Sequence, residues 1–441
     1  MASTKDHHTI HNKSNILLIA IGSRGDVEPF LAVGALLKRS GYSNLACCFP
    51  EQFRSLAEDE ELPFYSLGTE FLEMLDTAEG KDIMGADLGT ITKFKLYYKL
   101  YKQSKVVHDK HMQIEQDAVA DFKPDLIIYH VKSIYPTAWE AANPGKTLML
   151  SPVPCIVKKT SAYPTLGFSF SLGEWFNRMT YSLTNAAIEN TVKSYNKRLK
   201  SPLDITKAQI KKAYKETPMV YTVSPSLFPV DKSWGEETHL VGYQERNKTS
   251  HWTPSDEIKQ FIDQHDKVLL LTFGSMINPN PEGKTKILTD ILTKHKIPTL
   301  INTAAGGLVD LPGLDSDLFH VVKRIPYDWL LPQVYGVIHH GGSGTTHLTA
   351  KYGCVSMIIP HIIDQFLWDR LSSDRGMGPR GIGVSKLSSQ IESKILDLFH
   401  NQEYKTAALK VSGEMHREDY SKRIVTLISN QLKVSRDSNE A

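Results

Sequence analysis

A glycine-rich turn holds the densest set of side chains that could do chemistry. An apolar segment at 336–338 runs into the residues HHGGSGTT at 339–346, and a helical pattern follows. Such a turn favours phosphate, because glycine lets the backbone approach the ligand and the helix dipole attracts negative charge. Hydroxyl and imidazole groups add hydrogen-bond donors. The residues predicted to bind a diphosphate are His340, Gly342, Ser343, Gly344, Thr345 and Thr346.

A carboxylate and an amide follow the next apolar segment. Residues 355–359 end at Pro360, and Asp364 and Gln365 come four and five residues later. Carboxylate and amide groups form hydrogen bonds with hydroxyls, so this pair suits a sugar beside a diphosphate. Together with the turn it predicts a nucleotide-sugar site. The alternative interpretation is that Asp364 only caps the helix that follows it.

Near the N-terminus, Asp26 lies in the sequence IGSRGDVEPF at 21–30, directly after an apolar segment. Transfer of a sugar to a hydroxyl needs a base that removes the proton as the oxygen attacks. A carboxylate at the mouth of a sheet can act as that base, and we expect Asp26 to do so. The alternative is that Asp26 is the N-cap of a helix after Pro29. The residues expected to shape the turn are Ser23, Arg24 and Gly25.

These motifs resemble those of the family 1 UDP-glycosyltransferases. HHGGSGTT, the Asp364-Gln365 pair and RGMGP at 375–379 resemble the family's donor motif. GSRGDVEP at 22–29 resembles a signature of the sterol and lipid glucosyltransferase branch, which antibiotic glycosyltransferases share. Two compound motifs in family order are specific, because each alone has a real false-positive rate. The resemblance spans nearly the whole chain.

The resemblance implies a fold and a chemistry. The fold is GT-B, in which two doubly wound α/β domains with parallel sheets face a central cleft. The activity is inverting transfer from a UDP-sugar, which is a co-substrate, with no cofactor and no metal ion. Asp26 is then the base. Gly274-Ser275 resembles the turn that opens the family's second domain, which implies that Ser275 approaches the diphosphate.

The chain departs from the family pattern at the nucleoside. Many members place a tryptophan there to stack on uracil, whereas this chain has Arg324 followed by Ile325. A guanidinium can also lie flat on a base. Arg324 and Ile325 are therefore assigned to the nucleoside, and the choice between UDP and TDP stays open.

The elements that must position these residues alternate between strands and helices, which predicts parallel sheets with crossover helices. Strands are expected at 15–21, 44–49, 62–67, 125–130, 147–151 and 221–224, and again at 267–273, 299–303, 319–322, 336–339 and 355–359. The expected domains are 1–243 for the acceptor and 244–441 for the donor. We expect a final helix, from about 417 to 432, to pack back on the first domain.

The composition bears on which partners and which cellular compartment the protein can have. With Lys+Arg 51 and Asp+Glu 49 the net charge is +2, so the chain lacks the large positive charge that attracts nucleic acid. Cys47, Cys48, Cys155 and Cys354 show no metal-ligand spacing, which suits buried thiols in a reducing compartment. The first fourteen residues are polar and contain no secretory pattern, and no apolar run is long enough to span a bilayer. We expect a cytoplasmic protein.

A basic, tyrosine-rich segment raises the question of membrane contact. Thr92–His111 interleaves six lysines with apolar and tyrosine positions. Such a segment can lie on an anionic membrane, or it can be a solvated helix whose lysine stems cover the domain. The loop at 152–170, with Tyr163, Phe168 and Phe170, either lines an apolar acceptor pocket or only packs.

The predicted function is transfer of a sugar, expected to be glucose, from a UDP-sugar to a hydroxyl of a lipophilic acceptor such as a sterol. Three alternatives remain. In the first, the acceptor is a polyketide or glycopeptide aglycone instead of a sterol. In the second, the chain is a UDP-sugar epimerase, and in the third it is a non-catalytic partner of another transferase. The Asp26 motif and the Asp364-Gln365 pair oppose the epimerase, and the intact diphosphate turn and base oppose the non-catalytic partner.

Overall fold

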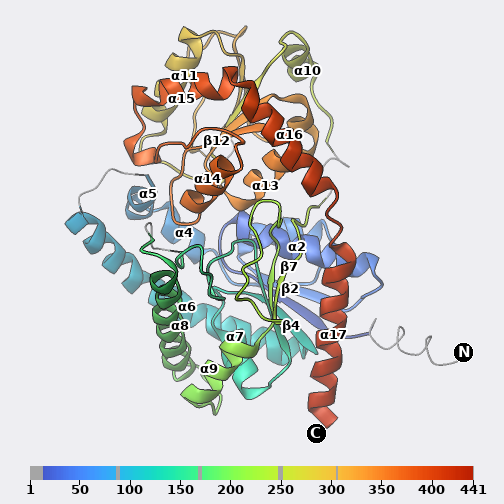
Figure 1. Ribbon diagram of the computed structural model, residues 1–441. Coiled ribbons are helices and arrows are strands. Elements are labelled where there is room, and N and C mark those ends of the chain that lie inside the picture. The colour runs from blue at the N-terminus through green and yellow to red at the C-terminus, as the bar shows by residue number, and fades with distance from the viewer. Residues whose placement is uncertain (1–12, 86–89, 167–170, 247–251, 304–305, 441) are drawn as a thin grey trace, which may run out of the picture.

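The computed structural model describes residues 13–85, 90–166, 171–246, 252–303 and 306–440. Two parallel sheets form two stacked domains, with the N-terminal domain below and the C-terminal domain above in Figure 1. In the described chain the first sheet has the order β3-β2-β1-β4-β5-β6-β7 and the second the order β10-β9-β8-β11-β12. The expected fold of two doubly wound parallel-sheet domains is confirmed.

The strands of the first sheet are β1 (Ile16–Ile19), β2 (Leu45–Phe49), β3 (Phe64–Ser66), β4 (Leu126–His130), β5 (Thr147–Ser151), β6 (Met219–Tyr221) and β7 (Thr238–Leu240). Those of the second are β8 (Leu269–Thr272), β9 (Thr299–Asn302), β10 (Phe319–Val322), β11 (Gly336–His339) and β12 (Val355–Ile358). β6 begins two residues before the predicted strand, and β7 was not predicted. β7 has only three residues, too few for a periodic signal.

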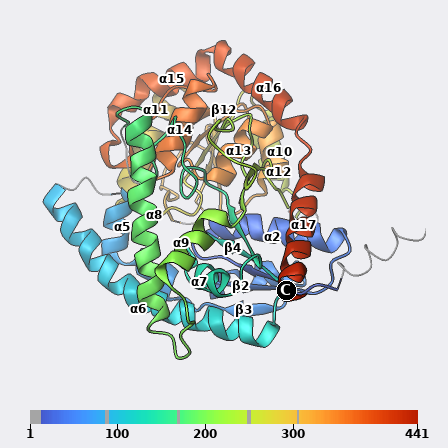
Figure 2. The same ribbon diagram turned by 60° about the horizontal axis from the view of Figure 1, so that its bottom comes forward.

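Helices cover both faces of the first sheet, which explains why its strands are apolar throughout. On β1, Leu17 and Ile19 pack with one group of helices, whereas Ile16 and Leu18 pack with the other. Figure 2 shows the two layers on either side of the sheet. The first group is α6 (Thr90–Phe122), α7 (Tyr135–Ala142), α8 (Glu174–Asn196) and α9 (Lys207–Glu216), and the second is α2 (Arg24–Arg39) and α17 (Ser421–Glu440).

The second sheet is built in the same way. Leu269 and Leu271 of β8 face α11 and α15, while Leu270 faces α10 and α13. The helices of this domain are α10 (Asp256–Asp263), α11 (Pro281–Lys294), α12 (Tyr327–Leu330), α13 (Ser343–Lys351), α14 (Gln365–Asp374), α15 (Glu392–His400) and α16 (Gln402–His416). Short helices elsewhere are α3 (Arg54–Glu58), α4 (Glu70–Asp76) and α5 (Ala78–Gly85).

The C-terminal helix crosses from one domain to the other. The helix predicted at about 417–432 corresponds to α17, which starts four residues later, at Ser421, and runs to Glu440, while the preceding helix α16 ends at His416. Ile424, Ile428 and Leu432 of α17 are fully buried among the residues of the first sheet. In Figure 1, α17 runs down the side of the lower domain. The last helix therefore packs with the first domain.

Two further sequence observations have structural counterparts. Cys47, Cys48, Cys155 and Cys354 are free and buried, as expected for reduced thiols. Within the described chain, no helix combines the length and the apolar character that crossing a bilayer requires.

Candidate active site

Asp26 lies at the carboxyl end of β1, in the first turn of α2. Between strand and helix the chain turns at Gly22, whose φ is +135°. A Cβ added there would lie 2.1 Å from Asp26 Oδ2, so only glycine leaves room for the carboxylate. Gly25 lies inside the helix, which corrects its assignment to the turn. The residue that makes the bend is Gly22.

The Asp26 carboxylate is held by contacts on both oxygens. Oδ2 accepts hydrogen bonds from the Ser23 backbone N–H at 2.8 Å and from the Ser23 hydroxyl at 3.2 Å. Oδ1 accepts one from Lys132 Nζ at 2.8 Å, and His130 Nε2 lies 3.3 Å away. Burial, the largest single effect, acts to raise the pKa of Asp26, but Lys132, His130 and the Ser23 backbone N–H together outweigh it and the pKa is lowered. Asp26 is therefore an ionised carboxylate.

Asp26 is not the N-cap of a helix after Pro29, but it does take part in capping, because it forms a capping box with Ser23 at the start of α2. The helix starts at Arg24, so Asp26 is its third residue and Pro29 lies within the helix. Asp26 does receive the backbone N–H of Ser23, the residue that precedes the helix. This contact uses only Oδ2, and Oδ1 remains directed toward the residues that follow β4. Arg24 forms an ion pair with Glu28 at 2.9 Å and lies away from the carboxylate.

His130, the last residue of β4, and Lys132, two residues beyond it, were missed by the sequence prediction. The Lys132 backbone N–H donates to His130 Nδ1 at 3.3 Å, which leaves Nε2 to carry the proton toward Asp26. Burial lowers the pKa of His130 to about 3, so this imidazole is neutral. One signal was available: β4 neighbours β1, and carboxyl ends of adjacent parallel strands meet at the same edge.

The predicted diphosphate turn connects β11 to α13. Gly341 has a φ of +88°, and Gly342 directly precedes the helix. The His340 ring packs against two glycines. A Cβ added to Gly274 would lie 2.5 Å from the ring, and one added to Gly342 would lie 2.4 Å from it. Burial lowers its pKa to about 4, and its Nδ1 has no partner among the described residues. A neutral imidazole with spare hydrogen-bonding capacity thus stands beside the helix start.

The hydroxyls of the turn differ in availability. Ser343 Oγ donates to the carbonyl of Pro152, in the other domain, at 2.7 Å. Thr346 Oγ1 donates to the Gly342 carbonyl at 3.0 Å. Thr345 is partly exposed. Because two hydroxyls are used inside the protein, the free donors of this turn are the first backbone N–H groups of α13.

Asp364 directly precedes α14 and makes no capping hydrogen bond with its side chain, so the capping alternative is wrong. Burial raises its pKa to about 6, and the negative charge of Asp26 adds to this while Lys132 opposes it. Gln365 is already engaged, since its Oε1 accepts from the His361 and Ile362 backbone N–H groups at 2.7 and 3.2 Å. It shapes the loop that presents Asp364.

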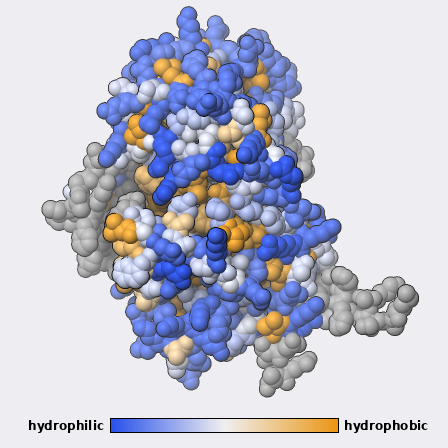
Figure 3. Space-filling model, viewed as in Figure 1, coloured by the Kyte–Doolittle hydropathy of each residue, from blue (hydrophilic) through white to orange (hydrophobic). Residues whose placement is uncertain are grey.

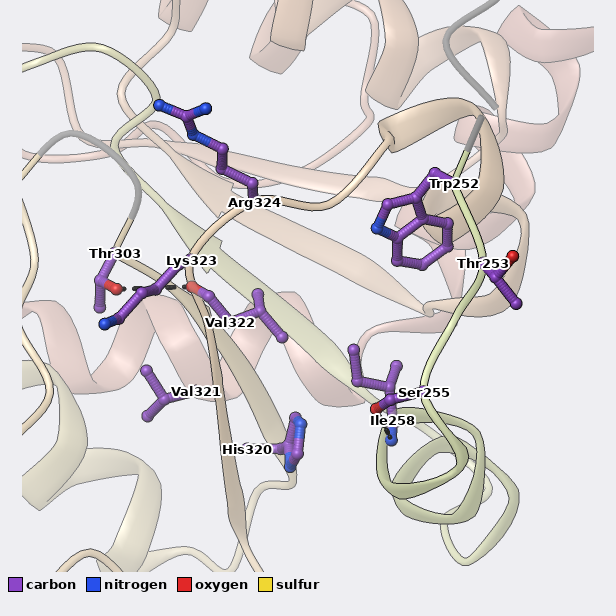
Figure 4. Close-up of a pocket in the computed structure, with 10 residues that line it drawn as sticks. All are labelled: Trp252, Thr253, Ser255, Ile258, Thr303, His320, Val321, Val322, Lys323 and Arg324. Carbon is purple, nitrogen blue, oxygen red and sulfur yellow. Dashed lines mark hydrogen bonds between the residues drawn. The ribbon is translucent and has the colours of Figure 1, made fainter. Parts of the chain in front are cut away.

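The residues predicted for the rest of the donor lie along the same edge of the second sheet. Ser275 is exposed in the turn after β8, and Ile325 is buried after β10. Arg324 is exposed and lines a hollow of about 780 Å³ with Trp252. In Figure 4 the Arg324 guanidinium points away from the Trp252 indole. The hollow follows edge strand β10, and its lining does not include the diphosphate turn.

Apolar side chains reach the surface near the boundary between the domains. Figure 3 shows apolar residues gathered where the two domains meet. Large exposed ones include Leu172 and Trp175 at the start of α8 and Ile363 and Phe366 at the start of α14. Arg370 of α14 lies over the Tyr163 ring at 5.3 Å, which joins α14 to the loop expected to meet the acceptor. The predicted Phe168 and Phe170 lie outside the described residues.

No three His, Cys, Asp or Glu side chains come together as a metal site in the residues that the structure describes. What the arrangement offers is a carboxylate from each domain, a lysine beside Asp26, and a helix start with a neutral imidazole. This combination can bind an anionic group on one side and accept a proton on the other.

Two family models match the chain. The one described as the glycosyltransferase family 28 N-terminal domain matches residues 16–118. The one described as erythromycin biosynthesis protein CIII-like, C-terminal domain, matches residues 299–430. The first match includes Asp26, and the second includes the diphosphate turn and Asp364.

The curated relatives include sterol glucosyltransferases. A sterol 3-beta-glucosyltransferase of Arabidopsis thaliana is 25% identical over 415 residues, covering 92% of this chain and 66% of the relative. One of Saccharomyces cerevisiae is 25% identical over 444 residues, covering 95% of this chain and 35% of the relative. The chain thus spans less than two thirds of the length of either relative.

Solved structures share the fold at low identity. The glycotransferase of kitacinnamycin superposes with a TM-score of 0.67 at 13% identity, over 95% of this chain and 99% of that one. The Streptomyces glycosyltransferase SsfS6, complexed with thymidine diphosphate, has a TM-score of 0.59 at 16% identity, over 95% of this chain and 99% of that one. The likeness extends over both domains.

Proposed function

Because the chain belongs to the family 1 glycosyltransferases of GT-B fold, in the branch of the sterol and antibiotic enzymes, we propose that it moves glucose from UDP-glucose to a hydroxyl of a lipophilic acceptor such as a sterol. One observation carries the proposal. The diphosphate turn of the second domain, whose His340 Nδ1 has no partner among the described residues, touches the carboxyl edge of the first sheet through Ser343 Oγ and the Pro152 carbonyl. That edge carries the Asp26 carboxylate, held by Lys132 Nζ at 2.8 Å.

In this mechanism the donor diphosphate lies at the start of α13, against its backbone N–H groups and His340. These donors stabilise the charge that builds up on UDP as it leaves. Asp364 binds hydroxyls of the sugar. Asp26 accepts the proton of the acceptor hydroxyl while that oxygen attacks the anomeric carbon from the face opposite UDP. The glycosidic bond to UDP breaks as the new one forms, which inverts the anomeric carbon.

The nucleoside is proposed to lie over Arg324 and Ile325, near Ser275 and beyond the diphosphate. These residues follow β10 and β8, so a nucleotide at the carboxyl edge of the second sheet can reach them. The neighbour SsfS6 holds thymidine diphosphate, which supports a nucleoside diphosphate as the ligand. We propose that no metal ion takes part.

The acceptor is proposed to be apolar because large apolar side chains are exposed in both domains, Leu172 and Trp175 around the start of α8 and Ile363 and Phe366 around the start of α14. The sterol glucosyltransferases among the relatives support the same class. We also propose a cytoplasmic protein that touches anionic membranes through Thr92–His111, which lies within α6 and exposes Val106. Vesicle sedimentation of Val106→Glu beside the wild type tests that contact.

The test of function is UDP release from UDP-glucose with a panel of sterols and polyketide aglycones, for wild type and Asp26→Asn. We expect release that needs a sterol and falls by roughly 10²-fold or more in the variant, since the base contribution is of that order. Excess EDTA is expected to leave the rate unchanged. Comparing the rate with TDP-glucose to the rate with UDP-glucose shows which nucleoside the enzyme prefers.

Calorimetric titration of UDP is the control for folding, because Asp26→Asn is expected to bind UDP like the wild type. Full activity in Asp26→Asn would remove Asp26 as the base and leave the transferase standing. Turnover only with aglycones would move the acceptor to that class. UDP binding without turnover on any acceptor would favour an epimerase or a non-catalytic partner.

A further inference from the structure

A glutamate of α6, Glu115, is fully buried although the mechanism above gives it no part. Its exposed fraction is 0%, and burial raises the pKa of its carboxyl to about 8. Removing a carboxyl from water costs free energy, so the hydrogen bond that it makes is the feature to explain.

This hydrogen bond holds the start of α7. Glu115 Oε2 accepts from the Tyr135 backbone N–H at 3.2 Å, and Tyr135 is the first residue of α7. Ile134, which precedes the helix, has an aliphatic side chain and makes no capping hydrogen bond. The first N–H groups of a helix lack partners inside it and are usually satisfied by such a cap. For Tyr135 the partner comes from another helix, α6.

The turn between β4 and α7 carries the two side chains that hold Asp26. Within this turn the Ser133 backbone N–H donates to the His130 carbonyl at 2.8 Å, and the Lys132 backbone N–H donates to His130 Nδ1 at 3.3 Å. His130 Nε2 lies 3.3 Å from Asp26 Oδ1, and Lys132 Nζ lies 2.8 Å from it. The turn is thus held at one end by β4, which pairs with β1, and at the other by Glu115.

We infer that Glu115 is a positioning residue for the reaction. It fixes the turn between β4 and α7 and thereby the two side chains that hold the Asp26 carboxylate. The inference rests on the proposed function, in which Asp26 is the base. When the contact with Tyr135 is lost, the turn shifts and Asp26 loses the donors that orient Oδ1, while the donor site in the other domain keeps its structure.

A second buried glutamate of the same domain is the matched control. Glu140 of α7 is 6% exposed and accepts from the Gly145 and Lys146 backbone N–H groups at 2.6 and 3.1 Å. These two residues precede β5, so they lie at the opposite edge of the parallel sheet from Asp26. Glu140 therefore makes the same kind of contact away from the base.

The test measures kcat and the KM for UDP-glucose with the acceptor that gives the highest rate. Glu115→Leu should lower kcat by about 10- to 100-fold, because small displacements of catalytic groups have effects of this size, and should leave KM within about twofold. Glu115→Asp, whose shorter side chain draws the oxygen away from Tyr135, should also lower kcat. Glu115→Gln should keep kcat, since an amide oxygen can accept the same N–H. Glu140→Leu should lose stability like Glu115→Leu and keep kcat.

A similar loss of kcat in Glu140→Leu would overturn the inference, because the effect would then be one of general stability. So would an unchanged kcat in Glu115→Leu, or a kcat in Glu115→Gln as low as that in Glu115→Leu. If Glu115→Leu does not fold, the comparison of Glu115→Asp with Glu115→Gln decides in its place.

Hydrogen exchange followed by mass spectrometry gives a readout without turnover. Peptides that contain Tyr135 should exchange faster in Glu115→Leu than in the wild type and in Glu115→Gln, whereas Glu140→Leu should affect peptides that contain Gly145 and Lys146. If the wild type transfers no sugar but this pattern holds, the proposed function fails and the anchoring of the turn stands. If the wild type is active and Tyr135 exchanges equally in all variants, the inference fails alone.

Discussion

At the scale of residues, two aspartates of the same chemistry differ in protonation because their surroundings differ. Asp26 receives an ammonium and two donors of Ser23, and its pKa is lowered. Asp364 is partly buried at the start of α14 and its side chain makes no capping contact, and loss of solvation raises its pKa to about 6. A carboxylate that stays ionised can accept a proton, whereas one with little solvation readily takes up hydrogen bonds from sugar hydroxyls.

Asp364→Asn should make the protein more stable at pH 8. The folded pKa of Asp364, about 6, lies above the ordinary aspartate value, so the folded state holds this proton more tightly than the unfolded state. Wild-type stability therefore falls as pH rises from about 4 to 6, and the neutral amide escapes this loss. Thermal unfolding should show a gain on the order of 1 kcal/mol at pH 8 that vanishes near pH 4.

Asp374→Asn is the control, because Asp374 lies at the other end of α14 and is 56% exposed. Its effect is expected to stay within about 0.5 kcal/mol at both pH values. A gain for Asp364→Asn that is larger at pH 4 than at pH 8 would contradict the assignment of a raised pKa.

At the scale of elements, α17 follows the second domain in the sequence but packs in the core of the first domain. Its residues Ile424, Ile428 and Leu432 repeat at intervals of four and share one face, which is fully buried against the first sheet. Most of the stability of such a helix comes from that apolar face. The helix thereby ties the end of the chain to the domain that holds Asp26.

Ile428→Ala should destabilise the N-terminal domain by about 2 to 5 kcal/mol, because it leaves a cavity in a core that is closed to solvent. Val434→Ala, on the same helix at a side chain that is 48% exposed, should change stability by less than about 0.5 kcal/mol. Urea unfolding followed by circular dichroism measures both. Equal effects of the two substitutions would show that α17 is not docked as described.

At the scale of the whole molecule, the contact between domains is both polar and apolar. Ile358, Trp368 and Leu371 of the second domain share one apolar cluster with residues of the first. Glu418, between α16 and α17, accepts from the Ser224 hydroxyl at 2.7 Å. Arg246, in the segment that joins the sheets, is buried and pairs with Glu28 at 3.0 Å and Glu60 at 2.8 Å.

Arg246→Met should cost about 3 kcal/mol, because two carboxylates lose a buried partner. Arg24 offers a matched comparison, since it pairs with the same Glu28 but is 50% exposed. Arg24→Met should cost less than about 1 kcal/mol. The urea midpoints of the two variants decide the matter, and a larger loss for Arg24→Met would mean that Arg246 does not anchor this segment.

The fold class, most strand positions and the two motifs could be read from the order of residues alone. Buried parallel strands must be apolar on both faces, and a tight turn at a helix start must contain glycine, so these features are written locally. Asp26, His340 and Asp364 could be picked out for the same reason. Each stands at the carboxyl end of a strand in a motif of a few residues.

The groups that surround these residues became known only from the folded chain. Lys132 and His130 lie more than one hundred residues from Asp26, and no periodicity connects them. Local motifs likewise could not show that Ser343 donates to Pro152 or that Gln365 holds its own loop. Hydrogen bonds and charge interactions depend on distances in space, which arise only when both sheets form and the domains meet. The protonation of each carboxylate follows from that assembly.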